Sequence, residues 1–218
     1  MKPKLTLENL ISEAQIFCIS QSKFEHKELF GVTDGKAVGT LIEQKFQKHL
    51  NEIYEVKIGS SANGIDLPSE DILTDIKVTS IKQPQSSCPF KDAKQKIFGL
   101  GYNLLVFVYD KSDNPTTKTA TLNFVSCSFI SKERTADYTT TKILNEMKRV
   151  DANIEDIAGY LNDCYFSTDE IFLRDLSEEI LTTPIQQGYV ANTNFLQWKL
   201  ASNFTGTTFG TFQLSYFK

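Results

Sequence analysis

Apolar residues recur with helical and strand periods along this chain of 218 residues. A 3.6-residue rhythm over residues 5–21 predicts one helix, and a similar apolar stripe over residues 36–53 predicts a second. Strict alternation over residues 72–80 predicts a strand with one buried face, and the continuous apolar run 104–109 predicts a buried central strand. Helices and strands in this order indicate an α/β fold with a mixed central β-sheet flanked by helices.

Shorter segments complete the expected layout. Strands are predicted at residues 54–60 and 119–129, with a short helix at 92–101 between them. Two helices are expected over residues 141–182, and the tail from residue 188 has the composition of short strands and loops. No linker or repeat interrupts the pattern, so residues 1–218 are expected to form a single domain with a helical and β-rich C-terminal region.

One hairpin carries the most specific chemistry. If residues 68–71 make the turn, Asp66 and Asp75 lie on neighbouring strands, opposite or nearly so, with about 5 Å between their Cβ atoms. Lys77 shares a face with Asp75 because strand side chains alternate. Two such carboxylates can hold Mg²⁺ against a phosphodiester, and the ammonium can orient or deprotonate a water. The alternative is an ordinary solvent-facing Asp–Lys pair on an amphipathic strand.

Charge is unevenly distributed along the chain, whose net charge is −4. Residues 151–182 hold nine acids and the single base Arg174, so the remainder of the chain is positive. Residues 77–96 hold five lysines against Asp92 alone. A polyanion could approach this basic stretch while the acidic segment faces solvent, although a solvated acidic surface and a chance lysine cluster explain the same pattern.

The motif Asp66…Asp75-x-Lys77 resembles the PD-(D/E)xK nuclease superfamily, and the size and layout resemble a type II restriction endonuclease. The resemblance covers about residues 36–129 and implies a restriction-endonuclease-like catalytic core there. It assigns recognition and dimerisation to the region of about residues 130–218.

The same resemblance implies a metal site and departs from the family in two places. Mg²⁺ would be held by Asp66, Asp75 and the carbonyl of Ile76. Ile65 stands where the motif has proline, and the spacing between the two aspartates is short for the family.

Glu43 is the candidate for a further acid, since members of the family often add one from the preceding helix. The alternative is a surface glutamate paired with Lys36 or Lys48. Lysines and side-chain amides that could contact phosphates or read adenine edges form the candidate DNA-binding set. They are Lys82, Gln83, Gln85, Lys91, Lys94, Gln95, Asn192, Asn194, Gln197 and Lys199.

The function expected from these features is that of a Mg²⁺-dependent type II restriction endonuclease cutting double-stranded DNA at a specific short sequence. Such enzymes usually act as homodimers on palindromic sites. No apolar run reaches the length of a membrane span and no secretory h-region is present, so we expect a cytoplasmic protein without a membrane partner. The alternatives are a repair or junction-resolving nuclease of the same superfamily and a non-catalytic DNA-binding module.

Overall fold

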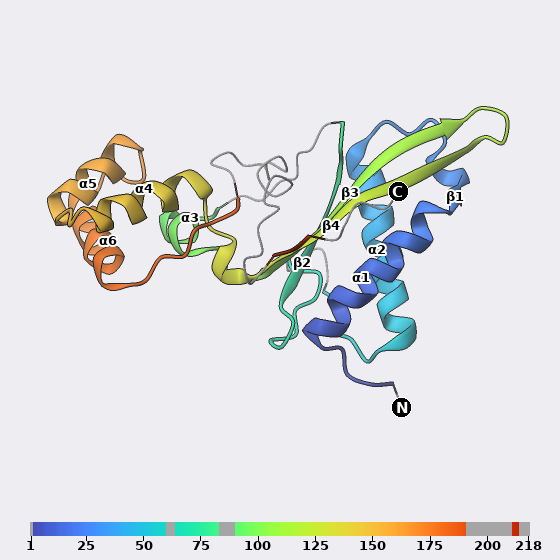
Figure 1. Cartoon of the computed structure of the whole chain (residues 1–218), viewed down its shortest axis with the longest axis horizontal. Coiled ribbons are helices and arrows are strands. Elements are labelled where there is room, and N and C mark those ends of the chain that lie inside the picture. The colour runs from blue at the N-terminus through green and yellow to red at the C-terminus, as the bar shows by residue number, and fades with distance from the viewer. Residues whose placement is uncertain (1, 60–63, 83–89, 191–210, 214–218) are drawn as a thin grey trace. The chain divides into compact units, whose positions relative to one another are not determined.

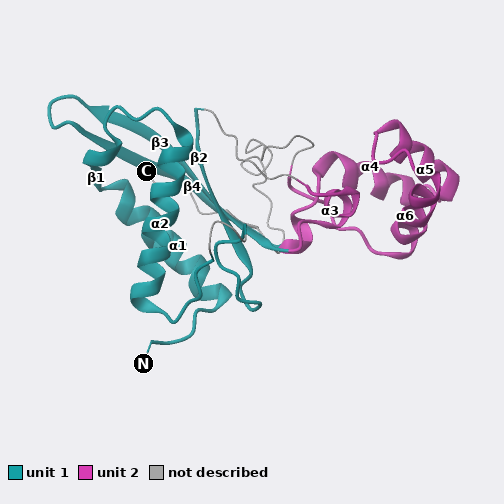
Figure 2. Ribbon diagram, turned by 180° about the vertical axis from the view of Figure 1, so that it is seen from behind, with its two compact units in different colours: residues 1–86, 102–131, 197–218 teal, residues 87–101, 132–196 magenta. Residues whose placement is uncertain are grey.

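A computed structural model describes residues 2–59, 64–82, 90–190 and 211–213 (Figure 1). The packing of the chain divides it into two compact units, which Figure 2 shows in different colours. The first, here called the sheet unit, comprises residues 1–86, 102–131 and 197–218, and the second, here called the helical unit, comprises residues 87–101 and 132–196.

The sheet unit consists of a mixed β-sheet and two long helices. Its strands follow the order β1-β4-β3-β2, and β5 pairs with β4 as well. Only β2 and β3 are parallel, whereas the other pairs are antiparallel. The elements are α1 (Leu7–Ser22), β1 (Glu25–His26), the 3₁₀ helix η1 (Lys27–Leu29), α2 (Gly35–Ile53), β2 (Thr74–Ser80), β3 (Asn103–Asn114), β4 (Thr119–Ile130) and β5 (Thr211–Gln213).

Helices α1 and α2 pack side by side on one face of this sheet (Figure 1). The rings of Phe17 on α1 and Phe46 on α2 lie 5.0 Å apart, and the Phe46 ring lies 5.2 Å from that of Phe107 on β3. Phe46 is fully buried, as is Ile42 one turn earlier. This packing fixes α2 against the strands. The face of α2 next to the packed one therefore lies close to β2.

The helical unit has its own apolar core. It contains α3 (Ala93–Phe98), the 3₁₀ helix η2 (Lys132–Arg134), α4 (Tyr138–Arg149), α5 (Ile154–Asp163) and α6 (Glu170–Thr182). The core is built from buried aliphatic residues: Ile97, Leu144, Ile157, Leu161, Leu173, Leu176 and Ile180. Asp92, Asp137, Asn153 and Asp169 cap the N-termini of the four α-helices by accepting backbone hydrogen bonds.

The α/β fold with a mixed sheet flanked by helices is confirmed, and the buried central strand is the core of β3. The predicted strand at residues 54–60 is wrong over its described part, since α2 runs to Ile53 and only Glu55 forms a bridge, to Lys4. Three helices rather than two cover residues 141–182, because Asn153 starts a new helix with a capping box. In the described sheet, β2 ends the strand order.

Most of the tail, including the strands expected there, lies outside the described residues, apart from β5. Among the helices of the described ranges, none combines the length and apolarity needed to cross a membrane.

Candidate active site

The predicted hairpin is present and sets the two aspartates opposite each other. Leu67 and Thr74 exchange both backbone hydrogen bonds, at 2.9 and 3.0 Å, and the amide of Ile72 closes the turn on the carbonyl of Ser69 at 3.0 Å. In this antiparallel register the next pair along is Asp66 and Asp75, at a position without backbone hydrogen bonds, where facing side chains come closest.

Both oxygens of the Asp66 carboxylate are held by neutral donors. Oδ1 accepts from the side-chain amide Nε2 of Gln47 at 2.9 Å, and Oδ2 accepts from the backbone N–H of Ile76 at 2.9 Å. The N–H and C=O of one strand residue point to the same edge. The carbonyl of Ile76 therefore faces the edge of β2 at which Asp66 lies.

Asp75 and Lys77 do not form a solvent-facing pair. Asp75 is only 4% exposed, and its Oδ2 lies 2.7 Å from Nζ of Lys77. Burial raises the pKa of Asp75 to about 6, although the nearby Lys77 ammonium opposes the rise; a hydrogen bond with Asp66 and the charge of Asp66 raise it further. Burial thus disfavours the ionised form of Asp75 even with Lys77 beside it.

Glu43, on α2, belongs to the same cluster. Burial raises the pKa of Glu43 to about 7; the Asp66 and Asp75 carboxylates add to the rise, and the Lys77 ammonium partly offsets it. Lys48, one of the two alternative partners considered for Glu43, lies against Glu52 instead, at 3.9 Å. The Glu43 carboxyl is close enough to Asp66 and Asp75 for their charges to raise its pKa.

The carboxylate oxygens of Asp66 and Asp75 and the carbonyl of Ile76 suit a hard divalent cation that keeps part of its water shell. Across the described residues, no three His, Cys, Asp or Glu side chains are grouped closely enough to hold a metal ion by themselves. Mg²⁺ needs no such cage, since it is usually bound by one or two carboxylates, waters and substrate phosphate. Asp66 and Asp75 supply two carboxylates, and a cation bound between them would favour the ionised form of Asp75, which burial disfavours.

The candidate DNA-binding residues fall into three groups. Lys82, in the sheet unit, is exposed and lies 3.3 Å from Asp110. Lys91, Lys94 and Gln95 are in the helical unit, where Nζ of Lys94 pairs with Glu179 at 2.6 Å. The side chain of Gln95 is engaged locally, accepting from the backbone of Lys91 at 2.9 Å. Gln83, Gln85, Asn192, Asn194, Gln197 and Lys199 lie outside the described residues.

Gln47 was not among the candidates from the sequence. It follows Glu43 by four residues, which places both on one face of α2. That spacing was the signal that could have indicated it, but a glutamine at such a position is common on solvent-facing helices.

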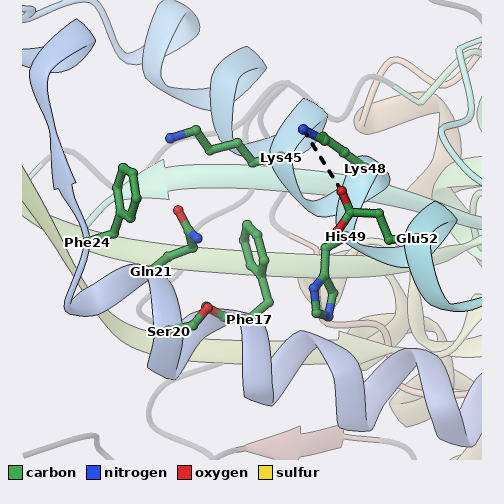
Figure 3. A pocket seen from close by; sticks show the side chains of 8 residues that line it. All are labelled: Phe17, Ser20, Gln21, Phe24, Lys45, Lys48, His49 and Glu52. Atoms are coloured by element: carbon green, nitrogen blue, oxygen red, sulfur yellow. Dashed lines mark hydrogen bonds and ion pairs between the residues drawn. The ribbon is translucent and has the colours of Figure 1, made fainter.

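A hollow of about 270 Å³ between α1 and α2 is separate from this cluster (Figure 3). It is lined by Phe17, Ser20, Gln21, Phe24, Lys45, Lys48, His49 and Glu52. Two of its side chains have acidic neighbours, since Nζ of Lys45 lies 2.8 Å from Glu28 and Nε2 of His49 lies 2.8 Å from Glu13. At 100° per residue, its α2 residues lie on the opposite side of that helix from Glu43 and Gln47.

A family model described as "Type II restriction enzyme NspV" matches residues 4–205. The chain belongs to the NspV family of type II restriction enzymes. Type II restriction enzyme NspV of Nostoc sp. (strain ATCC 29411 / PCC 7524) is 51% identical over 196 residues, which cover 90% of this chain and 88% of the relative. No solved structure matches the chain. Membership of the NspV family confirms the prediction of a type II restriction enzyme.

Proposed function

We propose that this member of the NspV family is a Mg²⁺-dependent endonuclease that hydrolyses phosphodiester bonds of double-stranded DNA at a specific short sequence. The observation that carries the proposal is the cluster at the hairpin. Asp66 lies opposite Asp75, Lys77 lies against Asp75 at 2.7 Å, and the charges of both carboxylates act on Glu43. These are the groups that metal-assisted hydrolysis of a phosphodiester requires.

Each residue has a distinct part in this proposal. Asp66, Asp75 and the carbonyl of Ile76 would hold the cation, which when bound neutralises charge on the phosphate and makes a coordinated water more acidic. Lys77 orients or deprotonates the water that attacks phosphorus in line with the leaving 3′-oxygen, and its positive charge stabilises the additional negative charge that develops. Glu43 contributes a further acid beside the two aspartates.

The domain organisation, the oligomeric state and the location of the protein are part of the same proposal. We take the protein to be a single nuclease domain acting in the cytoplasm as a homodimer, since a two-fold protein matches a palindromic DNA site. Residues of about 36–129 would form the catalytic core, and those of about 130–218 would serve recognition and dimerisation. The candidate DNA-binding residues given above keep their proposed role.

The test is plasmid cleavage by Asp75→Asn. With Mg²⁺, the wild type is expected to give discrete plasmid fragments and to lose this activity in EDTA, whereas Asp75→Asn cleaves at least about 100-fold more slowly because a metal ligand is lost. Asp71→Asn is the matched control: it removes an exposed carboxylate from the turn of the same hairpin and should cleave like the wild type.

Two outcomes would point elsewhere. Cleavage of branched DNA alone, with intact plasmid, would favour a junction-resolving nuclease. Failure of the wild type to cut any of a broad DNA panel in Mg²⁺ would favour a non-catalytic DNA-binding module.

A further inference from the structure

Asp66 and Asp75 are held in different ways. Asp75 has a cationic partner, Lys77 at 2.7 Å, whereas each oxygen of the Asp66 carboxylate accepts from a neutral donor, Gln47 or Ile76, at 2.9 Å. A cationic partner orients a carboxylate but also cancels part of the charge that would attract a metal ion. A neutral amide orients the carboxylate and leaves that charge in place.

Asp66 needs such support because of where it lies. It precedes the bridge between Leu67 and Thr74, and its own backbone is held by a hydrogen bond from the amide of Gly59 at 2.8 Å. One contact to Ile76 fixes a single carboxylate oxygen and leaves the plane of the group free to turn. The second contact, from Gln47 to the other oxygen, fixes that plane.

Gln47 is well placed to give this support. It lies between buried Phe46 and the next buried turn at Leu50, so its backbone is anchored by the packing of α2 against the sheet. Its amide nitrogen must face Asp66, since an ionised carboxylate only accepts hydrogen bonds and the Gln47 oxygen would be repelled.

We propose that Gln47 is the positioning residue of the metal site: its side-chain amide holds Asp66 in the orientation that binds the catalytic cation. The inference rests on the function proposed above and adds to it a residue on α2 that acts through its contact with Asp66. Hydrogen-bonding partners of metal ligands typically account for a 10- to 100-fold difference in metal affinity or activity.

The experiment compares Gln47→Met with the wild type. Methionine keeps the length of the side chain and its apolar stem but has no N–H donor. We expect binding of Mn²⁺ to the protein, measured from the free ion by electron paramagnetic resonance, to weaken by roughly 10- to 100-fold. The Mg²⁺ concentration for half-maximal plasmid cleavage should rise by a similar factor, while the rate at saturating Mg²⁺ and the affinity for DNA in Ca²⁺ stay close to wild type.

Gln44→Met is the matched control, since Gln44 is exposed on the same helix and should leave Mn²⁺ binding unchanged. If Gln47→Met destabilises the fold, Gln47→Leu gives a second version without the donor, and thermal unfolding without metal shows whether each variant is folded. Wild-type Mn²⁺ affinity in a folded donor-free variant would overturn the inference while leaving the proposed function intact. A wild type that neither binds Mn²⁺ nor cleaves DNA would instead refute the function itself.

Discussion

At the scale of single residues, the candidate site places acids where their charge opposes folding. The pKa of Glu43 is raised to about 7 by burial and by the neighbouring Asp66 and Asp75 carboxylates. Its folded form therefore binds a proton more tightly than the unfolded chain does. Between the ordinary value of 4.5 and about 7, the unfolded state holds fewer protons, so stability falls as pH rises through this window and remains lower above it.

Glu43→Gln should consequently stabilise the protein at pH 8 in the absence of metal. The neutral amide removes the repulsion, and because Glu43 is only partly buried we expect a gain of about 1 kcal/mol, less than the full pKa shift would give. Urea unfolding at pH 8 and pH 5 measures it, and the gain should shrink at pH 5, where Glu43 is largely protonated. Glu52→Gln, on the exposed end of the same helix, should change stability little at either pH. A loss of stability in Glu43→Gln at pH 8 would contradict the account.

A second buried titratable group, His26, gives the opposite pH dependence. Burial lowers its pKa, and the nearby Lys45 ammonium lowers it further against the smaller effect of Glu28. The unfolded state therefore binds more protons as pH falls below the ordinary value of 6.5, and stability is lost on acidification. We expect His26→Gln to flatten the stability profile between pH 7 and pH 5, as measured by urea unfolding. A profile as steep as that of the wild type would exclude His26 as its cause.

The residues of the site differ in how readily the sequence indicates them. Asp66, Asp75 and Lys77 are close in sequence, and the alternation of a strand was enough to predict that they share a hairpin. Gln47 could not be found in this way. Its contact with Asp66 depends on how closely α2 approaches β2, which is set by packing between distant segments and not by a local pattern.

At the scale of elements, the segment after α2 shows the limit of local patterns. Its β-like composition predicted a strand at residues 54–60, but the described part runs as irregular chain beside the hairpin. The amide of Gly59 donates to the carbonyl of Asp66 at 2.8 Å, so this segment supports the residue that the site needs. Separate backbone contacts, of Glu55 with the chain around Lys4 and of Gly59 with Asp66, take the place of the ladder that a strand would have formed.

Gly59→Ala tests that support. A Cβ at this position would lie 1.9 Å from the carbonyl oxygen of Ile65, so the segment or the hairpin must move. We expect a loss of about 1–3 kcal/mol in urea unfolding and a weaker Mn²⁺ affinity, because Asp66 follows Ile65 directly. Gly35→Ala is the control, since a Cβ there meets no atom within 4 Å and should leave both measurements unchanged or slightly improve stability. Unchanged Mn²⁺ binding in a destabilised Gly59→Ala would show that the segment supports the fold but not the site.

At the scale of the whole molecule, each of the two units has a packed core among the described residues, and the candidate site lies in the sheet unit. Glu43, Gln47, Asp66, Asp75 and Lys77 all belong to the sheet unit. The core of the helical unit is formed by its own helices and includes none of them. Metal binding should therefore depend on the packing of the sheet unit, and damage to the other core should reduce stability without affecting the site.

The same leucine-to-alanine change, made once in each core, separates loss of stability from loss of metal binding. Leu50 on α2 and Leu161 on α5 are both fully buried, one in each core. Each change to alanine should cost about 2–5 kcal/mol in urea unfolding, because it removes buried methyl groups and leaves a cavity. Only Leu50→Ala should weaken Mn²⁺ binding at a temperature where both variants remain folded, since Leu50 lies three residues beyond Gln47 on the helix that orients Asp66. Equal weakening by Leu161→Ala would show that the metal site also depends on the helical unit.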